Sequence, residues 1–309
     1  MRFNPKADIS SGRVSDSGRG SGGGLGGGSG TGGRIPIPTG GKGGVGTVVA
    51  IIVMLAVAYF SGGLGGLTGG GGGPGPDTGR YDECLSGADA NESADCARKA
   101  VEVSLGNYWA ATLPAQSDVQ FQDTQINSFS GSVQTQCGNA SAAVGPFYCP
   151  TDGTIYLDTT FFPEVLEKQL GGQGGDFVEP YVLGHEYGHH IQNLMGTMGR
   201  VRTQKGPESD AVRLELQADC YAGMWTAAAT KTQDDQGVAI FEELDQGDID
   251  EAIGAAQTVG DDRIQQKSGG RVDPEGWTHG SAEQRMRWFQ IGMEKGTLRA
   301  CDTFAASRL

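Results

Sequence analysis

Apolar residues recur every three to four positions along several stretches of the chain, which is the spacing of an amphipathic helix. Short runs with β-branched and aromatic residues predict strands instead. The pattern therefore predicts a mostly helical α+β domain with a small sheet. The predicted helices are Ala94–Leu113, Thr160–Leu170, Phe177–Met195, Ser209–Thr230, Asp248–Thr258 and Ser281–Lys295, and the predicted strands are Val119–Phe121 and Gly153–Leu157.

End signals support two of these helices. Asp176 can cap the third predicted helix and Gly196 can end it. Ser281 can cap the last helix, with Gln284 at the reciprocal position of a capping box. One face of the third helix carries, at helical spacing, Val178, Val182, His185, His189 and Gln192.

A separate apolar run, Thr47–Phe60, lies in a glycine-rich region without such a stripe. Of the 54 glycines, 28 fall in residues 1–79, and this composition cannot bury enough apolar surface to offset chain entropy. With its uncharged flanks the run reaches the length of one transmembrane helix. The predicted organisation is a disordered cytoplasmic tail over residues 1–44, a transmembrane anchor over 45–67, a Gly/Pro linker over 68–79 and a folded domain over 80–309.

Charge orients the predicted anchor. Residues 1–46 carry a net charge of +4 and the whole chain carries −14, so the basic side should face the cytoplasm and the acidic domain should lie outside. Cleavage as a signal peptide after Ala58 is less favoured, because the basic region before the run is far too long. A third interpretation of the apolar run is a helix buried in the core of the protein. The acidity of the domain makes nucleic acid an unexpected partner.

The acidic stretch Asp245–Glu251 has two interpretations. It could suggest calcium, but it lacks the spacing of an EF-hand loop. It fits a helix start better, with Asp248 as the cap and Glu251 three residues later. We therefore expect a helix and no calcium site here.

All six cysteines follow the apolar run, and an even count fits disulfides in an exported domain. Two pairs are close in sequence and favour local bridges, which leaves a third, long-range pair. Because no C-x-x-C occurs, zinc ligation by cysteine is less favoured. The expected pairs are Cys84–Cys96, Cys137–Cys149 and Cys220–Cys301.

The most specific chemical signal is H-E-x-x-H, formed by His185, Glu186 and His189. In a helix the two histidines lie one turn apart on the same face, so both can bind one Zn²⁺. The glutamate can then reach a metal-bound water as general base. The alternative is a buried helix whose histidines bind no metal.

A catalytic zinc needs a third protein ligand. A metzincin would require Gly at 192 and His at 195, where this chain has Gln192 and Met195. A later E-x-x-x-D offers Glu215 as the ligand and Asp219 as the residue that orients a ligand histidine. A solvated acidic face is the alternative, although the small residues beside this pair favour close helix packing.

His279 precedes the last predicted helix on a turn, where it could donate to the oxyanion of a tetrahedral intermediate. The alternative is a surface histidine. Arg285 could pair with Asp219 or Glu215 across the core. His190 lies about 100° round the helix from His189 and should point away from the metal.

Four segments together resemble the neutral zinc metallopeptidase family, a bacterial group of membrane-anchored peptidases. The segments are Gly145–Asp158, Tyr181–Gly196, Glu215–Trp225 and Thr278–Arg285, within a resemblance that covers roughly residues 80–300. The family resembles gluzincins, so the resemblance implies a zincin-like fold with one Zn²⁺ per chain.

Carried onto this chain, the resemblance implies that two histidines and one glutamate bind zinc and that Glu186 is the base. The implied ligands are His185, His189 and Glu215. Thr278-His279-Gly280 is similar to a Thr-His-Pro segment of integral-membrane zinc peptidases, in which the histidine contacts the reaction centre. This chain has Gly280 in place of that proline, which leaves the role of His279 open.

The predicted function is hydrolysis of a peptide or protein substrate by a metal-activated water, in a single-pass membrane protein with its catalytic domain outside. A non-catalytic zinc-containing binding module and a zinc hydrolase of a non-peptide bond are the alternatives. The strand-like segment Thr154–Asp158 could bind an extended peptide as an edge strand, or could be an ordinary core strand.

Overall fold

The computed structural model describes residues 1–20, 74–141 and 144–309. This part of the chain is mostly helical with a small sheet, which confirms the predicted α+β class. Its α-helices are α2 (Gly87–Glu92), α3 (Ala94–Gln116), α4 (Val178–Leu194), α5 (Asp210–Ala228), α6 (Gln246–Thr258), α7 (Asp261–Lys267) and α8 (Ala282–Lys295). Its strands are β1 (Arg2–Phe3), β2 (Val14–Arg19), β3 (Gln125–Ser130), β4 (Ser132–Thr135), β5 (Gly138–Ser141), β6 (Phe147–Cys149), β7 (Thr154–Asp158) and β8 (Phe241–Glu243). Shorter turns of helix are η3 (Phe162–Gln169), η4 (Thr197–Arg200), η5 (Ala229–Lys231) and η6 (Pro274–Gly276).

Five of the predicted helices are present as α3, α4, α5, α6 and α8, with ends that differ from the prediction by at most three residues. The helix predicted over residues 160–170 is a short π-helix, η3. Gly196 ends α4 in the left-handed region at φ 69°, as predicted. Ser281 caps α8 in a capping box with Gln284, also as predicted.

Two predicted caps are wrong. Asp176 does not cap α4, because both of its carboxylate oxygens accept hydrogen bonds from the α-ammonium group of Met1. At α6 the cap is Asp245, and Asp248 is its capping-box partner three residues later. Acidic residues are crowded at both helix starts, so the sequence alone does not show which carboxylate takes the cap.

The main sheet has the strand order β2–β3–β7–β6, in which β6 runs antiparallel and the other strands run parallel. The strand predicted over residues 153–157 is present as β7, and it is an inner strand, so of its two interpretations the core strand is confirmed and the edge strand is wrong. The free edge beyond β7 belongs to β6. The predicted strand over residues 119–121 is absent, because this segment is a loop.

The N-terminal segment, residues 1–20, is folded, so the disorder predicted for it is wrong. It pairs β1 with β8 and β2 with β3, and it buries the side chains of Phe3, Ala7 and Ile9. These apolar side chains are separated by polar residues, so no periodic stripe marks them. Residues 21–44 lie outside the described residues.

The predicted transmembrane anchor, residues 45–67, also lies outside the described residues, as do residues 68–73 of the predicted linker. Among the helices that the structure describes, none is long and apolar enough to cross a membrane. The described chain resumes beside β2, where Thr78 donates from its backbone and its hydroxyl to Asp16. The two described segments on either side of residues 21–73 therefore lie side by side.

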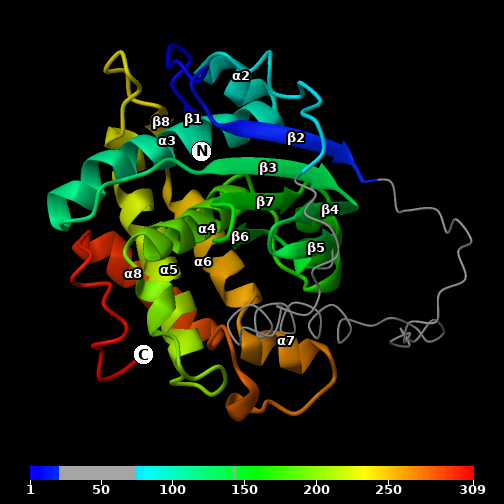
Figure 1. Ribbon diagram of the computed structural model, residues 1–309, viewed down its shortest axis with the longest axis vertical. Coiled ribbons are helices and arrows are strands. Elements are labelled where there is room, and N and C mark those ends of the chain that lie inside the picture. Colours follow the sequence, from blue (N-terminus) through cyan, green and yellow to red (C-terminus); the bar gives the residue numbers. More distant parts are fainter. Residues whose placement is uncertain (21–73, 142–143) are drawn as a thin grey trace, which may run out of the picture.

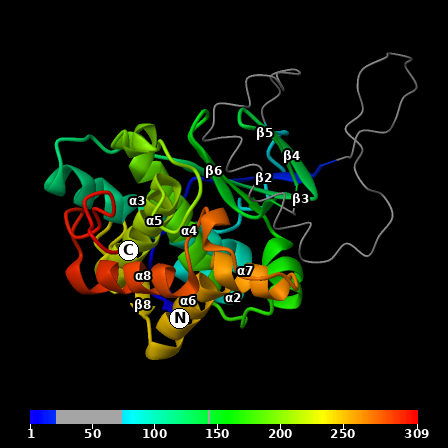
Figure 2. The same ribbon diagram turned by 90° about the horizontal axis from the view of Figure 1, so that it is seen from below.

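Helices α4, α5 and α8 form a stack on one side of the sheet, with α4 nearest to it (Figure 1; Figure 2). Glycines allow their backbones to approach closely. A Cβ atom at Gly188 of α4 would lie 3.0 Å from the Ala218 backbone of α5, and one at Gly292 of α8 would lie 1.9 Å from the Cys220 carbonyl oxygen. The close packing expected from the small residues of α5 is thus present, and it holds α4 between the sheet and the other two helices (Figure 1).

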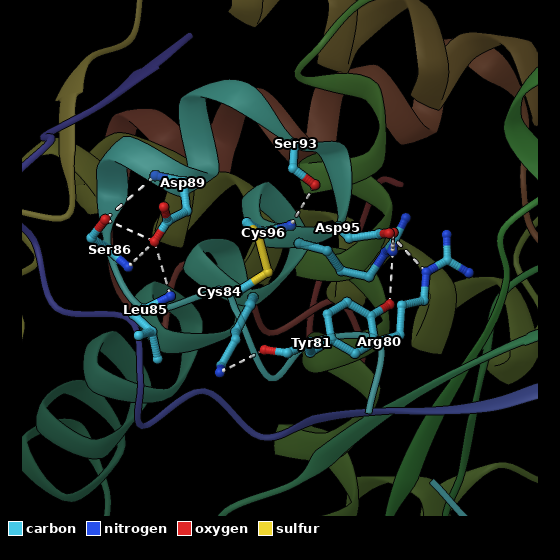
Figure 3. The surroundings of a disulfide bond; sticks show 11 residues. Arg80, Tyr81, Cys84, Leu85, Ser86, Asp89, Ser93, Asp95 and Cys96 are labelled. Atoms are coloured by element: carbon cyan, nitrogen blue, oxygen red, sulfur yellow. Dashed lines mark hydrogen bonds and ion pairs between the residues drawn. A yellow bond between two sulfur atoms is a disulfide. The ribbon is translucent and has the colours of Figure 1, made fainter. Parts of the chain in front are cut away.

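All three expected disulfides are confirmed: Cys84–Cys96, Cys137–Cys149 and Cys220–Cys301. Figure 3 shows the first of them joining the segment before α2 to the first turn of α3, next to the Ser93 cap. The third ties the segment after α8 to α5.

Candidate metal centre

Two histidines of α4 and one glutamate of α5 meet in the core. His185 Nε2 lies 3.2 Å and His189 Nε2 lies 3.5 Å from the two carboxylate oxygens of Glu215. The imidazole rings are 4.8 Å apart between centroids and nearly perpendicular. One potential ligand atom from each of the three side chains lies within 4.8 Å of the others, so they can share one ion.

These distances fit a zinc ion. Ligand atoms about 2.0–2.1 Å from one tetrahedral zinc lie about 3.4 Å from each other. The observed separations of 3.2 and 3.5 Å are close to that value. Two imidazole nitrogens and one carboxylate leave a fourth position for water, which is the pattern of catalytic zinc sites. The three side chains fit the ion that the sequence predicts.

The outer nitrogen of His185 is held by Asp219. His185 Nδ1 lies 2.8 Å from Asp219 Oδ1, and Tyr181 donates its hydroxyl to the same oxygen at 2.7 Å. Arg285 donates to both Asp219 oxygens at 2.8 and 2.9 Å. The predicted placement of Asp219 behind a histidine is thus present, and so is its pairing with Arg285.

The electrostatics of this group follow from those contacts. Burial disfavours the Asp219 carboxylate, but the charges of Arg285 and His185 outweigh it and lower the pKa of Asp219 to about 2. Burial likewise disfavours protonation of His185, yet the Asp219 carboxylate raises the pKa of this imidazole to about 10. Asp219 therefore stays ionised and acts as a fixed anion against Nδ1 of His185.

The outer nitrogen of His189 is held by a neutral amide. His189 Nδ1 lies 2.8 Å from Gln192 Oε1, and Gln192 Nε2 donates to the Leu214 carbonyl at 2.7 Å. A carbonyl can only accept, so the Gln192 atom facing Leu214 must be the NH₂ group and the atom facing His189 must be the oxygen. His189 then carries a proton on Nδ1, and Nε2 is the nitrogen that faces the shared position beside Glu215.

Glu186 projects from the same turn of α4. Its side chain is 7% exposed, and burial raises the pKa of its carboxyl, although the charges of His189 and His185 oppose that shift. The backbone N–H of Tyr148 in β6 is also directed at this carboxylate. Glu186 is thus placed between the paired imidazoles and the edge strand of the sheet.

Glu215 is an anion among cationic partners. Burial alone would raise its pKa, but the charges of His189 and His279 and the hydrogen bonds to both ligand-position histidines hold the pKa well below its usual range. His279, from the loop before α8, therefore lies close enough to act on this carboxylate. The structure brings together all six residues predicted for the site: His185, Glu186, His189, Glu215, Asp219 and His279.

A residue that the sequence analysis did not identify fixes the His279 loop. Asp261, 5% exposed in the first turn of α7, accepts hydrogen bonds from the backbone N–H groups of Thr278, His279 and Gly280 at 2.8, 2.7 and 3.0 Å. Its other oxygen lies 3.5 Å from His279 Nδ1. The pair is 18 residues apart in sequence, and no spacing rule connects an acid at a helix start with such a loop.

Gly280 explains the departure from the proline of the similar family. Its φ is +89°, and its N–H donates to Asp261. Proline has a fixed φ near −65° and no N–H, so it could do neither. In this chain the loop is held by a carboxylate in place of a rigid ring.

His190 points away from the metal centre, as predicted. Its Nε2 lies 2.7 Å from the Gln122 carbonyl and must donate to it, so Nδ1 accepts from the Tyr148 hydroxyl at 3.1 Å. Asn193 donates to the same hydroxyl at 3.0 Å. Burial lowers the pKa of His190, which keeps it neutral in this role. His190 therefore anchors the edge strand β6 to α4.

A second acidic group, Asp176, Asp248 and Glu251, has ligand-like spacing. Its carboxylates already have partners. The Met1 α-ammonium group lies 3.0 Å from Asp176 and 2.6 Å from Asp248, and Glu251 accepts from the Phe177 backbone N–H. This group thus binds the N-terminal segment to the domain.

Comparison with known proteins identifies relatives over most of the chain. A family model described as "Putative neutral zinc metallopeptidase" matches residues 2–304. An uncharacterized protein of Mycobacterium tuberculosis strain H37Rv is 49% identical over 74% of this chain and 76% of its own length. The uncharacterized protein YpfJ of Escherichia coli K12 is 36% identical over 86% of this chain and 88% of its own length. No solved structure gives a significant match.

Proposed function

Because this chain belongs to the neutral zinc metallopeptidase family, we propose that it is an enzyme that hydrolyses peptide bonds with one zinc ion per chain. The observation that carries the proposal is the convergence of His185 Nε2, His189 Nε2 and the Glu215 carboxylate, each with its own supporting contacts. Such a donor set suits zinc and leaves room for water.

The ion, when bound, lowers the pKa of a coordinated water to about 7 and polarises the scissile carbonyl. His185, His189 and Glu215 would hold it. Glu186, which lies in the same turn of α4 as the histidine pair and is not one of the three ligands, takes the proton of the attacking water and passes it to the leaving amine. Its raised pKa makes this carboxylate a better proton acceptor.

His279 is the proposed donor to the oxyanion. Burial lowers the pKa of this imidazole, but the charge of Glu215 and the hydrogen bond to Asp261 raise it overall. A protonated imidazole that is fixed by the Asp261 carboxylate is a preorganised donor for developing negative charge.

The edge strand β6 offers a place for an extended peptide. It is the outer strand on the side of α4, and the Tyr148 backbone N–H faces Glu186 and not the neighbouring strand β7. A peptide that pairs with this edge would place its backbone beside Glu186. This supports a peptide or protein substrate over a small non-peptide one.

An extracytoplasmic location is part of the proposal. Three disulfides with no free cysteine in the described chain are typical of proteins in oxidising compartments. The anchor over residues 45–67 stays a prediction from the sequence.

The decisive experiment replaces Glu186 with Gln. We expect hydrolysis of a mixture of unstructured peptides to fall at least about a thousandfold while one zinc stays bound, because Gln keeps the shape but cannot take a proton. Metal content and peptide cleavage are measured on the same samples, with Glu283→Gln, an exposed residue of α8, as the matched control.

Three outcomes separate this proposal from its alternatives. Parental cleavage by Glu186→Gln would show that Glu186 is not the base. Bound zinc without cleavage of any peptide, in a wild-type protein that retains an envelope partner, would favour a binding module. Turnover of an ester or amide that is not a peptide, with peptides untouched, would favour another zinc hydrolase.

A further inference from the structure

The hydrogen bonds behind His189 continue beyond Gln192. Gln192 Nε2 donates a second hydrogen bond, at 3.1 Å, to Gln217 Oε1 on α5. Gln217 Nε2 donates at 3.0 Å to the carbonyl of Cys301, in the segment after α8. Gln192, Gln217 and Cys301 are 0%, 4% and 0% exposed, so water does not compete for these bonds.

The direction of this chain of bonds is fixed at its far end. The Cys301 carbonyl can only accept, so Gln217 must turn its NH₂ group to Cys301 and its oxygen to Gln192. Gln192 must then turn its NH₂ group to Gln217, and the Leu214 carbonyl demands the same orientation. The oxygen of Gln192 is therefore left facing His189, and this places the proton of His189 on Nδ1.

The Cys301 carbonyl is itself held against α5 from two sides. The disulfide joins Cys301 to Cys220, one turn of α5 after Gln217. Next to it, Thr303 donates its hydroxyl to the Arg213 carbonyl at 2.6 Å, and the Arg213 guanidinium donates to the carbonyls of Thr303 and Ala306. The segment after α8 is thus attached to α5 one turn before Gln217, at Arg213, and one turn after it, at Cys220.

We propose that Gln217 is a positioning residue that, together with the carbonyls of Leu214 and Cys301, holds the Gln192 amide and thereby sets the ring orientation of His189 and the zinc affinity of the site. The proposal rests on the metal-binding part of the proposed function. It assigns different supports to the two histidines: a charged one, Asp219 with Arg285, behind His185, and a neutral one behind His189 that originates in the C-terminal segment.

The first test replaces Gln217 with Met, which has a similar volume but neither donates nor accepts strongly. Gln192 then loses one of its two orienting partners. Loss of such support behind a ligand histidine typically weakens metal binding 10- to 100-fold. We expect a rise of that size in the zinc dissociation constant, measured by competition with a chelator. Gln266→Met, at an exposed position of α7, should leave the constant unchanged.

The second test observes the hydrogen bond on Nδ1 of His189 by nuclear magnetic resonance in the zinc-bound protein. With only four histidines in the chain, the ring signals can be assigned. The Nδ1–H of His189 should exchange slowly with solvent in the wild type and faster in Gln217→Met, because the Leu214 carbonyl alone then holds the Gln192 amide. The Nδ1–H of His185, which Asp219 holds, should exchange at its wild-type rate in the same variant, whereas general destabilisation would speed up both.

Two results would overturn the proposal. One is a folded Gln217→Met protein that binds zinc as tightly as the wild type. The other is an Nδ1–H of His189 that exchanges as slowly in Gln217→Met as in the wild type. If the zinc-binding part of the proposed function were wrong instead, the wild-type protein itself would bind no zinc.

Discussion

Glu102 of α3 is a fully buried carboxyl group with one oxygen that has no hydrogen-bond partner among the described residues. It is 0% exposed, its Oε2 accepts from the Arg13 backbone N–H at 2.7 Å, and its Oε1 has no hydrogen-bond partner among the described residues. Arg13, Lys99 and Asp123 are the charged groups that face it. Burial raises the pKa of Glu102 to about 7, because the opposing charges of Arg13 and Lys99 are too weak to offset it.

This carboxyl makes stability depend on pH. Below pH about 4.5 both the folded and the unfolded chain carry the proton, and between pH 4.5 and 7 only the unfolded chain releases it. Stability from this group is therefore present at low pH and is lost as the pH rises to about 7. Glu102→Gln should be more stable than the wild type at pH 8 by at most about 3 kcal/mol, and nearly equal to it at pH 4.5. Urea unfolding at both pH values measures the difference, and exposed Glu83→Gln is the control.

Asp261 predicts a kinetic effect. Asp261→Asn removes the negative charge beside His279 and one of the oxygens that hold the loop, so His279 should be both less often protonated and less well oriented. We expect kcat to fall about tenfold or more, with KM and zinc content close to the wild-type values. A rise in KM with an unchanged kcat would assign Asp261 to substrate binding instead.

At this scale the sequence identified what repeats at helical spacing or matches a motif. His185, His189, Glu215 and Asp219 share two helical faces, so their meeting could be anticipated. Asp261 and Gln217 could not be found, because their function depends on which loop or carbonyl the fold places opposite them. The residues next to Asp261 and Gln217 in the sequence form no motif that indicates these contacts.

Among the elements, the helical stack depends on the absence of side chains at a few crossings. Gly223 of α5 and Gly292 of α8 lie against backbone atoms of the partner helix, where an added Cβ atom would lie 2.0 and 1.9 Å from a carbonyl oxygen. Since α5 carries Glu215 and Asp219, this contact also positions the metal centre.

Gly292→Ala should therefore destabilise the protein by roughly 1–3 kcal/mol, because α8 must move away from α5. Gly254 of α6 is the matched control, since a Cβ atom there meets nothing within 4 Å. Gly254→Ala should stabilise the helix by roughly 0.5–1 kcal/mol. Thermal unfolding of the two variants compares them. If Gly292→Ala and Gly254→Ala changed the stability equally, the contact between α8 and α5 would not depend on a glycine at position 292.

The sheet shows why strands were harder to predict than helices. The adjacent residues of β2 and β3 are largely polar and yet buried: Ser128 donates its hydroxyl to Asp16 at 2.6 Å, and Asn127 donates to Ser15 at 2.9 Å. Hydrogen bonds between neighbouring strands satisfy these groups, so they need no water. The sequences of β2 and β3 therefore lack a regular alternation of apolar and polar positions, and among the strands of the main sheet only β7 was predicted from hydropathy.

For the molecule as a whole, the important feature is that residues 1–20 and 74–309 pack as one body. A single membrane crossing between residues 45 and 67 would separate them, and β2 would then lose β3. The predicted topology and this packing therefore cannot both hold for the same folded chain. The packing requires both parts on one side of any membrane.

Labelling with a membrane-impermeant maleimide distinguishes a single membrane crossing from packing of both parts on one side of the membrane. All six native cysteines are paired, so a cysteine at exposed Ser10 or exposed Asp235 is the only free thiol of its variant. In intact cells, Ser10→Cys and Asp235→Cys should react to the same extent. Reaction of Asp235→Cys before permeabilisation, with Ser10→Cys reacting only after it, would support the single crossing.

The pairing of β1 with β8 has a consequence for synthesis. Arg2 and Phe3 are made long before their partners, Phe241 and Glu243. The strand β1 therefore stays unpaired until β8 has been made, although β2 can pair with β3 much earlier. A nascent chain stalled before residue 240 should be cleaved by proteases near β1 more readily than the complete chain.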